Sequence, residues 1–136
     1  MVVIEIPGEL RGKGRPRFAR VGQHVRTFTD DKTVSMENWV KACAVKVWNR
    51  PPMLGALGIR LTIGVAVPQS WSQRKRGEAL EGAIKPTGKP DIDNAIKLIF
   101  DSLNGIVWGD DKQITEATII RRYAAQPMTV MTVFEA

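Results

Sequence analysis

Hydrophobic and polar residues alternate strictly in one stretch near the middle of the chain. Its apolar side chains occupy every second position: Leu57, Ile59, Leu61, Ile63, Val65 and Val67. A period of two is that of a β-strand with one buried face, so we predict a strand over residues 57–67. Shorter apolar runs bounded by turn residues predict three further strands, over residues 2–6, 114–123 and 128–134.

Two other segments carry apolar residues at helical spacing. The first helix is predicted over residues 29–48, after a cap at Thr29 or Asp30 and before two prolines. Its apolar positions are Val34, Met36, Trp39, Val40, Cys43, Ala44, Val47 and Trp48. The second is predicted over residues 93–103, where Asn104-Gly105 supplies the stop signal. Its apolar face consists of Ile96, Ile99, Phe100 and Leu103. The polar connection over residues 69–90 allows a short helix at 72–80.

The order of these elements and their short connections predict an α+β fold. We expect one domain over residues 1–136, with two main helices on one face of a small, mostly antiparallel or mixed sheet. Apolar residues make up 43% of the chain and charged residues 25%, which is typical of a globular protein and excludes a fibrous or disordered one.

Cysteine usage and hydropathy indicate the compartment. Cys43 is the single cysteine, so no internal disulfide forms and a reducing environment is the simpler interpretation. The first residues are apolar only briefly and follow no basic segment, unlike a signal peptide. No apolar run approaches the length of a membrane span. We therefore expect a cytoplasmic protein without a membrane partner.

The formal charge of +6 favours a polyanionic partner such as nucleic acid. Six cationic residues and no acidic one lie between Leu10 and Thr29, interleaved with glycine and proline: Arg11, Lys13, Arg15, Arg17, Arg20 and Arg26. The glycines and the proline predict that this basic segment is a loop.

Within this basic chain, five of the fourteen acidic residues lie between Asp91 and Asp111. Clustered carboxylates repel one another unless a cation or a proton neutralises them. Asp93, Lys97 and Asp101 follow at steps of four, which places them as one polar stripe on the second helix. Carboxylates without histidine or cysteine suit Mg²⁺ or Mn²⁺, and Lys97 is placed to offset charge in a phosphoryl transition state. Singly, each aspartate is also an ordinary helix cap or surface charge.

This acidic region resembles the RusA family of Holliday junction resolvases. The resemblance rests on a PDxDN-like segment, a lysine one turn later and a downstream WxDD-Q motif: Pro90-Asp91-Ile92-Asp93-Asn94, Lys97, Asp101, Leu103, Trp108, Asp110, Asp111 and Gln113. More loosely it extends to GKGRPRF at residues 12–18, to the first helix and to the basic loop.

The resemblance implies a RusA-like fold and a homodimeric, Mg²⁺-dependent endonuclease that resolves four-way DNA junctions by paired nicks. It implies that Asp91, Asp93 and Asp111 are the catalytic metal ligands and Lys97 the catalytic lysine. It leaves the role of Asp110 open and makes Asp101 a structural partner of Lys97.

Basic residues flanking this region are the expected phosphate contacts: Lys13, Arg15, Arg17, Arg74, Lys75, Arg76 and Lys89. Phe18 and Trp71 lie beside them and are candidates for stacking on exposed bases. Some relatives carry a run of arginines just before the position of Asp91, where this chain has only Lys85 and Lys89.

Two other functions fit parts of the pattern. In a non-catalytic DNA-binding module, the basic segment binds DNA and the aspartates are caps or a degenerate metal site. A nucleotide phosphohydrolase is disfavoured because the DIDN sequence does not follow an apolar strand and the charge suits a polymer.

Overall fold

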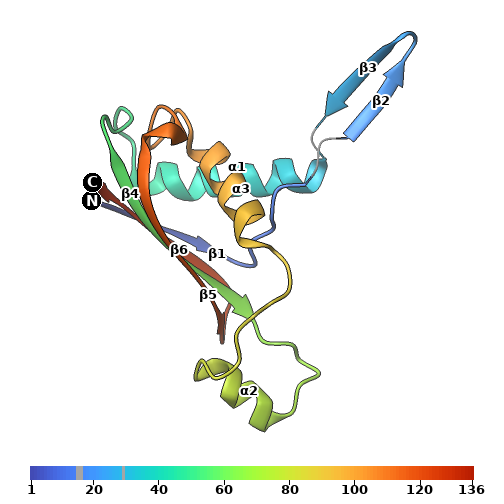
Figure 1. Cartoon of the computed structure of the whole chain (residues 1–136), viewed down its shortest axis with the longest axis vertical. Coiled ribbons are helices and arrows are strands. Elements are labelled where there is room, and N and C mark those ends of the chain that lie inside the picture. The colour runs from blue at the N-terminus through green and yellow to red at the C-terminus, as the bar shows by residue number, and fades with distance from the viewer. Residues whose placement is uncertain (15–16, 29) are drawn as a thin grey trace.

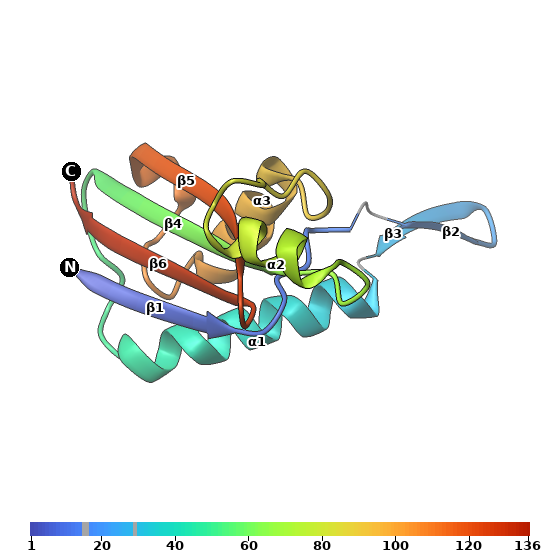
Figure 2. The same cartoon turned by 90° about the horizontal axis from the view of Figure 1, so that it is seen from below.

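The computed structural model describes the backbone of residues 1–14, 17–28 and 30–136, and between residues 15 and 29 the side chains of Arg20 and of residues 22–25. Its centre is a four-stranded sheet in the order β1-β6-β4-β5 (Figures 1 and 2). The strands are β1 (Val2–Pro7), β4 (Leu57–Ala66), β5 (Ile114–Ala124) and β6 (Met128–Glu135). β4 pairs with β5 in parallel, and the β1–β6 and β4–β6 pairs are antiparallel. The predicted mixed sheet is confirmed.

β5 and β6 are consecutive in the chain but lie on opposite sides of β4 (Figure 2). The short connection over residues 125–127 therefore crosses the end of β4. Gly64 on β4 pairs with Met128, the first residue of β6. A Cβ at Gly64 would lie 2.7 Å from the Met128 carbonyl oxygen, so this approach of the two strands requires glycine.

Two helices, α1 (Asp31–Val47) and α3 (Ile92–Leu103), cover one face of the sheet (Figures 1 and 2). Their buried side chains meet the odd-numbered residues of β4, including Ile59, Leu61 and Ile63, in one hydrophobic core. Asp30 caps α1 by accepting a hydrogen bond from the Thr33 amide, as expected; the other candidate cap, Thr29, lies outside the described residues. α3 carries the strongest apolar and polar segregation, which positions its polar side away from the core.

The buried stripes of the helices are narrower than the apolar spacing predicts. On α1, Val34, Trp39 and Val47 are exposed, because only one side of the helix faces the core. On α3, Leu98 is fully buried and was missing from the predicted face, whereas Ile96 is only half-buried. Sequence spacing alone does not fix the angle at which a helix meets the sheet.

The prediction that the basic segment is a loop is wrong for residues 17–28. Part of this basic segment is a hairpin of β2 (Arg17–Val21) and β3 (His24–Phe28), which projects beyond the start of α1 (Figure 1). Gly22 has a φ of 61° and opens a two-residue turn with Gln23. A turn with glycine first favours a tight hairpin, and this signal outweighs the density of arginine and glycine.

The predicted short helix within the polar connection is confirmed as α2 (Gln73–Leu80). Ser72 caps it by accepting a hydrogen bond from the Lys75 amide. α2 and the hairpin lie at opposite ends of the long axis, with α3 between them (Figure 1). No helix in the described part of the chain is long and apolar enough to span a membrane.

Candidate active site

The polar side of α3 presents the predicted stripe of Asp93, Lys97 and Asp101. The opposite side, which includes Leu98 and Ile99, is buried in the core, so the helix cannot rotate without exposing apolar surface. Lys97 Nζ lies 4.0 Å from Asp101 Oδ2, which is the predicted pairing one turn apart. Lys97 nevertheless keeps 66% of its side chain exposed. It therefore remains accessible to a ligand.

Asp91 is the N-cap residue of α3, but its carboxylate makes no capping hydrogen bond. Asp91 and Asp93 are both exposed. An N-cap carboxylate ordinarily accepts a hydrogen bond from the first turn of its helix. Asp91 accepts none, so it is not a simple cap. Its oxygens are left for another partner.

Lys13 enters this site from the N-terminal part of the chain. Its Nζ lies 2.5 Å from Asp101 Oδ2, and the two side chains are only 22% and 26% exposed. Sequence reasoning assigned Lys13 to phosphate and named Lys97 as the cation that acts with the aspartates. The contact spans 88 residues of sequence, and no local spacing announces it.

A close backbone fit places Lys13 there. The Lys13 amide donates to the Asn94 carbonyl over 3.1 Å, and the Gly14 amide donates to the Thr33 hydroxyl over 2.9 Å. A Cβ on Gly12 would lie 2.8 Å from the Cβ of Asn94. Residues 10–14, here called the strap, are thus held between α1 and α3, and the glycine permits that approach.

The loop that follows α3 is held by Trp108 and Gln113. Trp108 is fully buried, packs edge-on against Phe100 and donates from its indole nitrogen to Asn104 Oδ1 over 2.7 Å. Gln113 Oε1 accepts from the amides of Gly109 and Asp110, while its Nε2 donates to the Met53 and Gly55 carbonyls. The amide of one side chain therefore joins this loop to the segment before β4.

The two neighbouring aspartates in this loop have different tasks. Asp110 caps the short 3₁₀ helix η1 (Asp111–Gln113) by accepting from the Lys112 amide over 3.2 Å. That backbone hydrogen bond, with a further one from Asp111, lowers the pKa of Asp110. Asp110 is therefore satisfied locally, which sets it apart from its neighbour.

Asp111 experiences the charges of the α3 stripe. Partial burial raises the pKa of Asp111, the hydrogen bond and charge of Asp110 and the charge of Asp101 raise it further, and Lys97 lowers it. Asp111 thus lies close enough to Asp101 and Lys97 to interact with both. The last turns of α3 and the start of η1 form one electrostatic group.

Arg121 on β5 supports the segment that leads into Asp91. Its guanidinium donates to the carbonyls of Gly88 and Pro90, the latter over 2.8 Å. Sequence reasoning missed Arg121 because it lies in a strand, 31 residues beyond Pro90. It anchors the start of α3 to the edge of the sheet.

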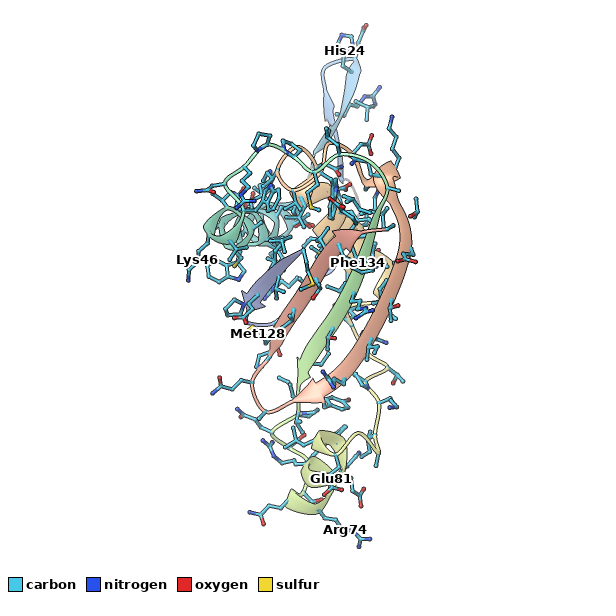
Figure 3. All side chains as sticks on the ribbon, turned by 90° about the vertical axis from the view of Figure 1, so that its left-hand side faces the viewer. His24, Lys46, Arg74, Glu81, Met128 and Phe134 are labelled. Atoms are coloured by element: carbon cyan, nitrogen blue, oxygen red, sulfur yellow. The ribbon has the colours of Figure 1, made fainter. Side chains whose placement is uncertain are left out.

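The donor chemistry of this site fits a hard cation. The acidic side chains of the site offer oxygen ligands, whereas His24 lies at the tip of the hairpin (Figure 3) and Cys43 is buried in the core. Among the residues that the structure describes, no three acidic, histidine or cysteine side chains are already grouped as a ligand cage. Magnesium does not require one, because it keeps several waters and uses one or two carboxylates together with substrate phosphate.

The expected DNA contacts lie in separate parts of the molecule. Arg74 is exposed near Glu78, Lys75 lies 4.0 Å from the Trp71 ring centre, and Arg76 donates to the Pro68 carbonyl. Trp71 is also packed edge-on against Tyr123, so its ring is already engaged. Lys89 lies just before Asp91. Arg15 lies outside the described residues, as do the side chains of Arg17 and Phe18 on β2.

Comparisons with known proteins agree with this arrangement. The family model described as "Endodeoxyribonuclease RusA" matches residues 7–133. A Bacillus subtilis (strain 168) protein named "Uncharacterized protein YqaN" is 26% identical over 130 residues, which cover 94% of this chain and 92% of that protein. The match includes the strap, α3 and the loop of Trp108 and Gln113.

Proposed function

Because the chain belongs to the RusA family of endodeoxyribonucleases, we propose that it resolves four-way DNA junctions by paired, symmetric nicks that depend on Mg²⁺. The observation that supports the proposal is the Lys97–Asp101 pair on the exposed side of α3, whose charges also act on the pKa of Asp111. Such a group suits hydrolysis of a phosphodiester, whose charge needs both a cation and positioned acids.

Asp91, Asp93 and Asp111 are the residues that would hold the metal, with Mn²⁺ as a substitute for Mg²⁺. When bound, the ion would polarise the phosphate and favour hydroxide over water at the point of attack. Asp91 is suited by its carboxylate, which makes no cap bond, and Asp111 by a pKa that burial and the neighbouring carboxylates raise. A bound cation would give the Asp91 carboxylate a partner and would stabilise the ionised form of Asp111.

Lys97 would bring positive charge to the oxygens of the scissile phosphate. Asp101 limits where its ammonium group can lie, and Lys13 offsets the charge of Asp101 on its other side. Asp110 would have no direct role, because its carboxylate caps η1. These assignments separate the two aspartates of the loop.

A homodimer would suit this substrate. A four-way junction has approximate two-fold symmetry, and a two-fold dimer presents two equivalent sites to equivalent strands. Light scattering should therefore give a mass of about 30 kDa, twice the 15.1 kDa of one chain. A mass of one chain at every concentration would contradict the dimer.

The decisive experiment incubates the protein with a synthetic four-way junction or a linear duplex, with and without Mg²⁺. The wild type should cut the junction only with Mg²⁺, and Asp91→Asn should bind it but lose at least about a hundredfold in single-turnover rate. Glu37→Gln, a half-buried acid on α1, is the matched control and should cut normally.

Each other result has a definite meaning. An intact junction in Mg²⁺ with normal binding would support the non-catalytic DNA-binding module instead. Equal cutting by Asp91→Asn would remove Asp91 from the site. Lys97→Ala should retain binding and lose most cleavage; weaker binding with normal cleavage rate would make Lys97 a phosphate contact only.

A further inference from the structure

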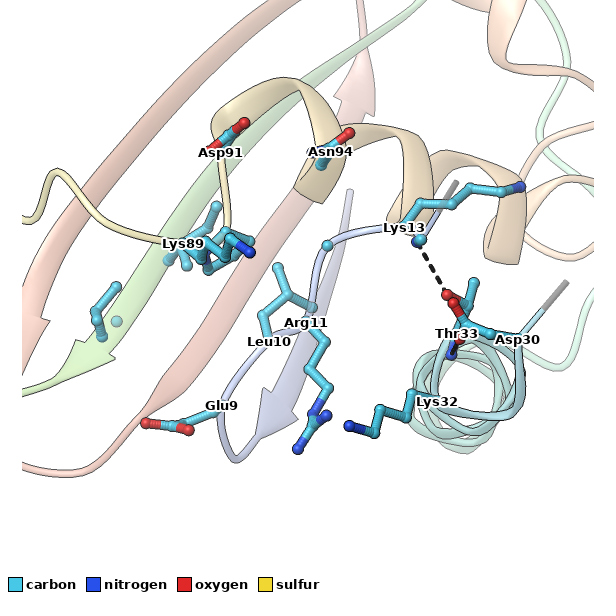
Figure 4. Close-up of a pocket in the computed structure, with 16 residues that line it drawn as sticks. Glu9, Leu10, Arg11, Lys13, Asp30, Lys32, Thr33, Lys89, Asp91 and Asn94 are labelled. Atoms are coloured by element: carbon cyan, nitrogen blue, oxygen red, sulfur yellow. Dashed lines mark hydrogen bonds between the residues drawn. The ribbon is translucent and has the colours of Figure 1, made fainter. Parts of the chain in front are cut away.

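A cavity of about 490 Å³ is lined by Asp91 and not by Lys97. It lies between the strap, the start of α1, the last residues of β4 and the segment before α3 (Figure 4). A volume of this size falls in the range of sites that take a small organic ligand. None of the roles given above to Asp93, Lys97 and Asp101 involves this cavity.

The deeper lining of the cavity is apolar. Leu10 and Ile63 are almost fully buried, and Val65 and Pro90 are half-buried beside them. Val65 lies near the end of β4, where it packs against the edge of the core and is only partly buried. It therefore presents apolar surface to the cavity, and a flat apolar group would gain by covering it.

Cations outnumber acids around the cavity: Arg11, Lys13, Lys32 and Lys89 line it together with Glu9, Asp30 and Asp91. Arg11 and Lys32 lie along one edge with their charged ends on the same side, and Lys89 lies across from them (Figure 4). Within the described residues, none of these three cations forms an ion pair. Lys13 also lines the cavity, but its ammonium group extends away to Asp101. Adjacent cations without acidic partners favour an anionic ligand.

We infer that this cavity binds one nucleotide of the DNA strand beside the cut, with its base against Val65 and Pro90 and its phosphate at Arg11 and Lys32. The location beside Asp91 rests on the proposed function, whereas the ligand class rests on the cavity itself. An apolar surface beside cations that outnumber acids matches a base attached to a phosphate. Neither part alone would select a nucleotide over a lipid or a simple anion.

A four-way junction supplies a nucleotide that can enter such a cavity. Extracting a base from a duplex costs stacking and pairing energy, and the cost is lowest where the regular stack is already interrupted. The branch point is such an interruption. The cavity would thus favour cleavage at the branch over cleavage in continuous duplex.

The first test needs neither a junction nor a metal. Thymidine 5′-monophosphate is titrated into the full chain in chelator, and the methyl resonances of Leu10, Ile63 and Val65 are followed by NMR. We expect saturable shifts at these methyls, which inorganic phosphate does not reproduce. Val65→Phe, which fills the cavity, should weaken binding about tenfold, the loss of roughly one stacked base.

Val45→Phe adds the same volume on the exposed side of α1 and is the control. Equal nucleotide affinity in Val65→Phe, or shifts that phosphate reproduces, would overturn the proposal. Arg11→Gln and Lys32→Gln should also weaken binding, whereas Lys41→Gln, elsewhere on α1, should not. The unfolding transition of each variant confirms that it is folded before its affinity is compared.

The second test places a fluorescent adenine analogue, 2-aminopurine, at the branch point. Binding of wild type in Ca²⁺ should raise its fluorescence because the base leaves the stack. Val65→Phe should bind the junction and lose most of the rise. An undiminished rise in Val65→Phe would contradict base insertion. If the wild type binds the nucleotide but leaves the junction intact in Mg²⁺, only the proposed resolvase function is contradicted.

Discussion

Asp101 is the residue on which two lysines converge. Lys13 contacts it directly from the strap, and Lys97 lies 4.0 Å away on the next turn of α3. Both Lys13 and Asp101 are largely covered, so their interaction is less screened than that of an ordinary surface pair. The position of Lys97 in the site therefore depends on a carboxylate that need not touch substrate.

We expect Asp101→Asn to lower the single-turnover cleavage rate by roughly tenfold to a hundredfold while junction affinity changes little, because Lys97 loses its orienting partner. It should also lower the free energy of unfolding by about 1–2 kcal/mol. Glu78→Gln, which breaks the exposed pair with Arg74, is the control and should change neither.

A double-mutant cycle with Lys13→Ala separates the contact from other effects. The two substitutions should be non-additive in unfolding free energy by about 1 kcal/mol. Additive effects would show that the Lys13–Asp101 contact does not persist in solution.

Asp111 gives the site a pH dependence. Its pKa is raised above the ordinary value of 3.8, so between these two values the folded state binds more protons than the unfolded state. Without metal, the stability owed to Asp111 therefore rises as pH falls through the raised pKa and levels off below the ordinary one. Affinity for Mg²⁺ changes in the opposite sense, because the ligand must be ionised.

Asp111→Asn should accordingly stabilise the metal-free protein at neutral pH by roughly half a kcal/mol and remove this contribution to its pH dependence. Thermal unfolding without metal, from a pH below the ordinary pKa of 3.8 up to neutral pH, measures both effects. Glu81→Gln at the end of α2 serves as the control. A destabilised Asp111→Asn at neutral pH would mean that the ionised carboxylate has a favourable partner in the folded protein.

Among the elements, the loop between α3 and β5 is the one whose shape depends most on a single side chain. Gln113 accepts from two backbone amides within the loop and donates to two carbonyls of the segment before β4. The buried Trp108 holds the other end of the loop. Together they decide where η1 begins and hence where Asp111 lies.

Gln113→Leu should lower the free energy of unfolding by about 1–3 kcal/mol, because it leaves backbone groups without partners. Cleavage should fall further than stability alone explains, since Asp111 is no longer held. Chemical denaturation and single-turnover cleavage at a temperature where the variant is folded measure the two effects. Gln73→Leu on exposed α2 is the control; a Gln113→Leu protein with normal cleavage would dissociate the loop from the site.

Across the whole molecule, positive charge is carried at both ends of the long axis. The hairpin with Arg20 projects at one end and α2 with Arg74 at the other (Figures 1 and 3), while α3 lies between them. Single short duplexes would be bridged poorly by such an arrangement, but the arms of a junction diverge from one point. The distribution of charge is therefore consistent with a branched polyanion.

Arg20→Gln and Arg74→Gln should each reduce the slope of log affinity against log salt by about 0.9, and their combination by about 1.8, if each end neutralises one phosphate. Junction binding measured over a series of salt concentrations gives the slope. Lys46→Gln, at the end of α1 (Figure 3), should leave it unchanged. An unchanged slope in either single variant would remove that end from the DNA path.

Local patterns were sufficient for most elements and for the polar stripe of α3. Strict alternation predicted β4, helical spacing predicted α1 and α3, and the spacing of Asp93, Lys97 and Asp101 predicted their common stripe. These features depend on the fixed periods of strands and helices, so they can be recognised without knowing what packs nearby. The hairpin was missed because its turn signal lies among residues whose composition favours a loop.

Long-range contacts supplied the rest. Two contacts join segments far apart in the chain: Lys13 pairs with Asp101, and Arg121 supports Pro90. The different tasks of Asp110 and Asp111 depend on the hydrogen bonds of one loop. The chain thus encodes its acids, cations and periodic elements locally. Which cation meets which acid follows from how the strap and η1 pack against α3, since charge interactions depend on distance in space and not on separation in sequence.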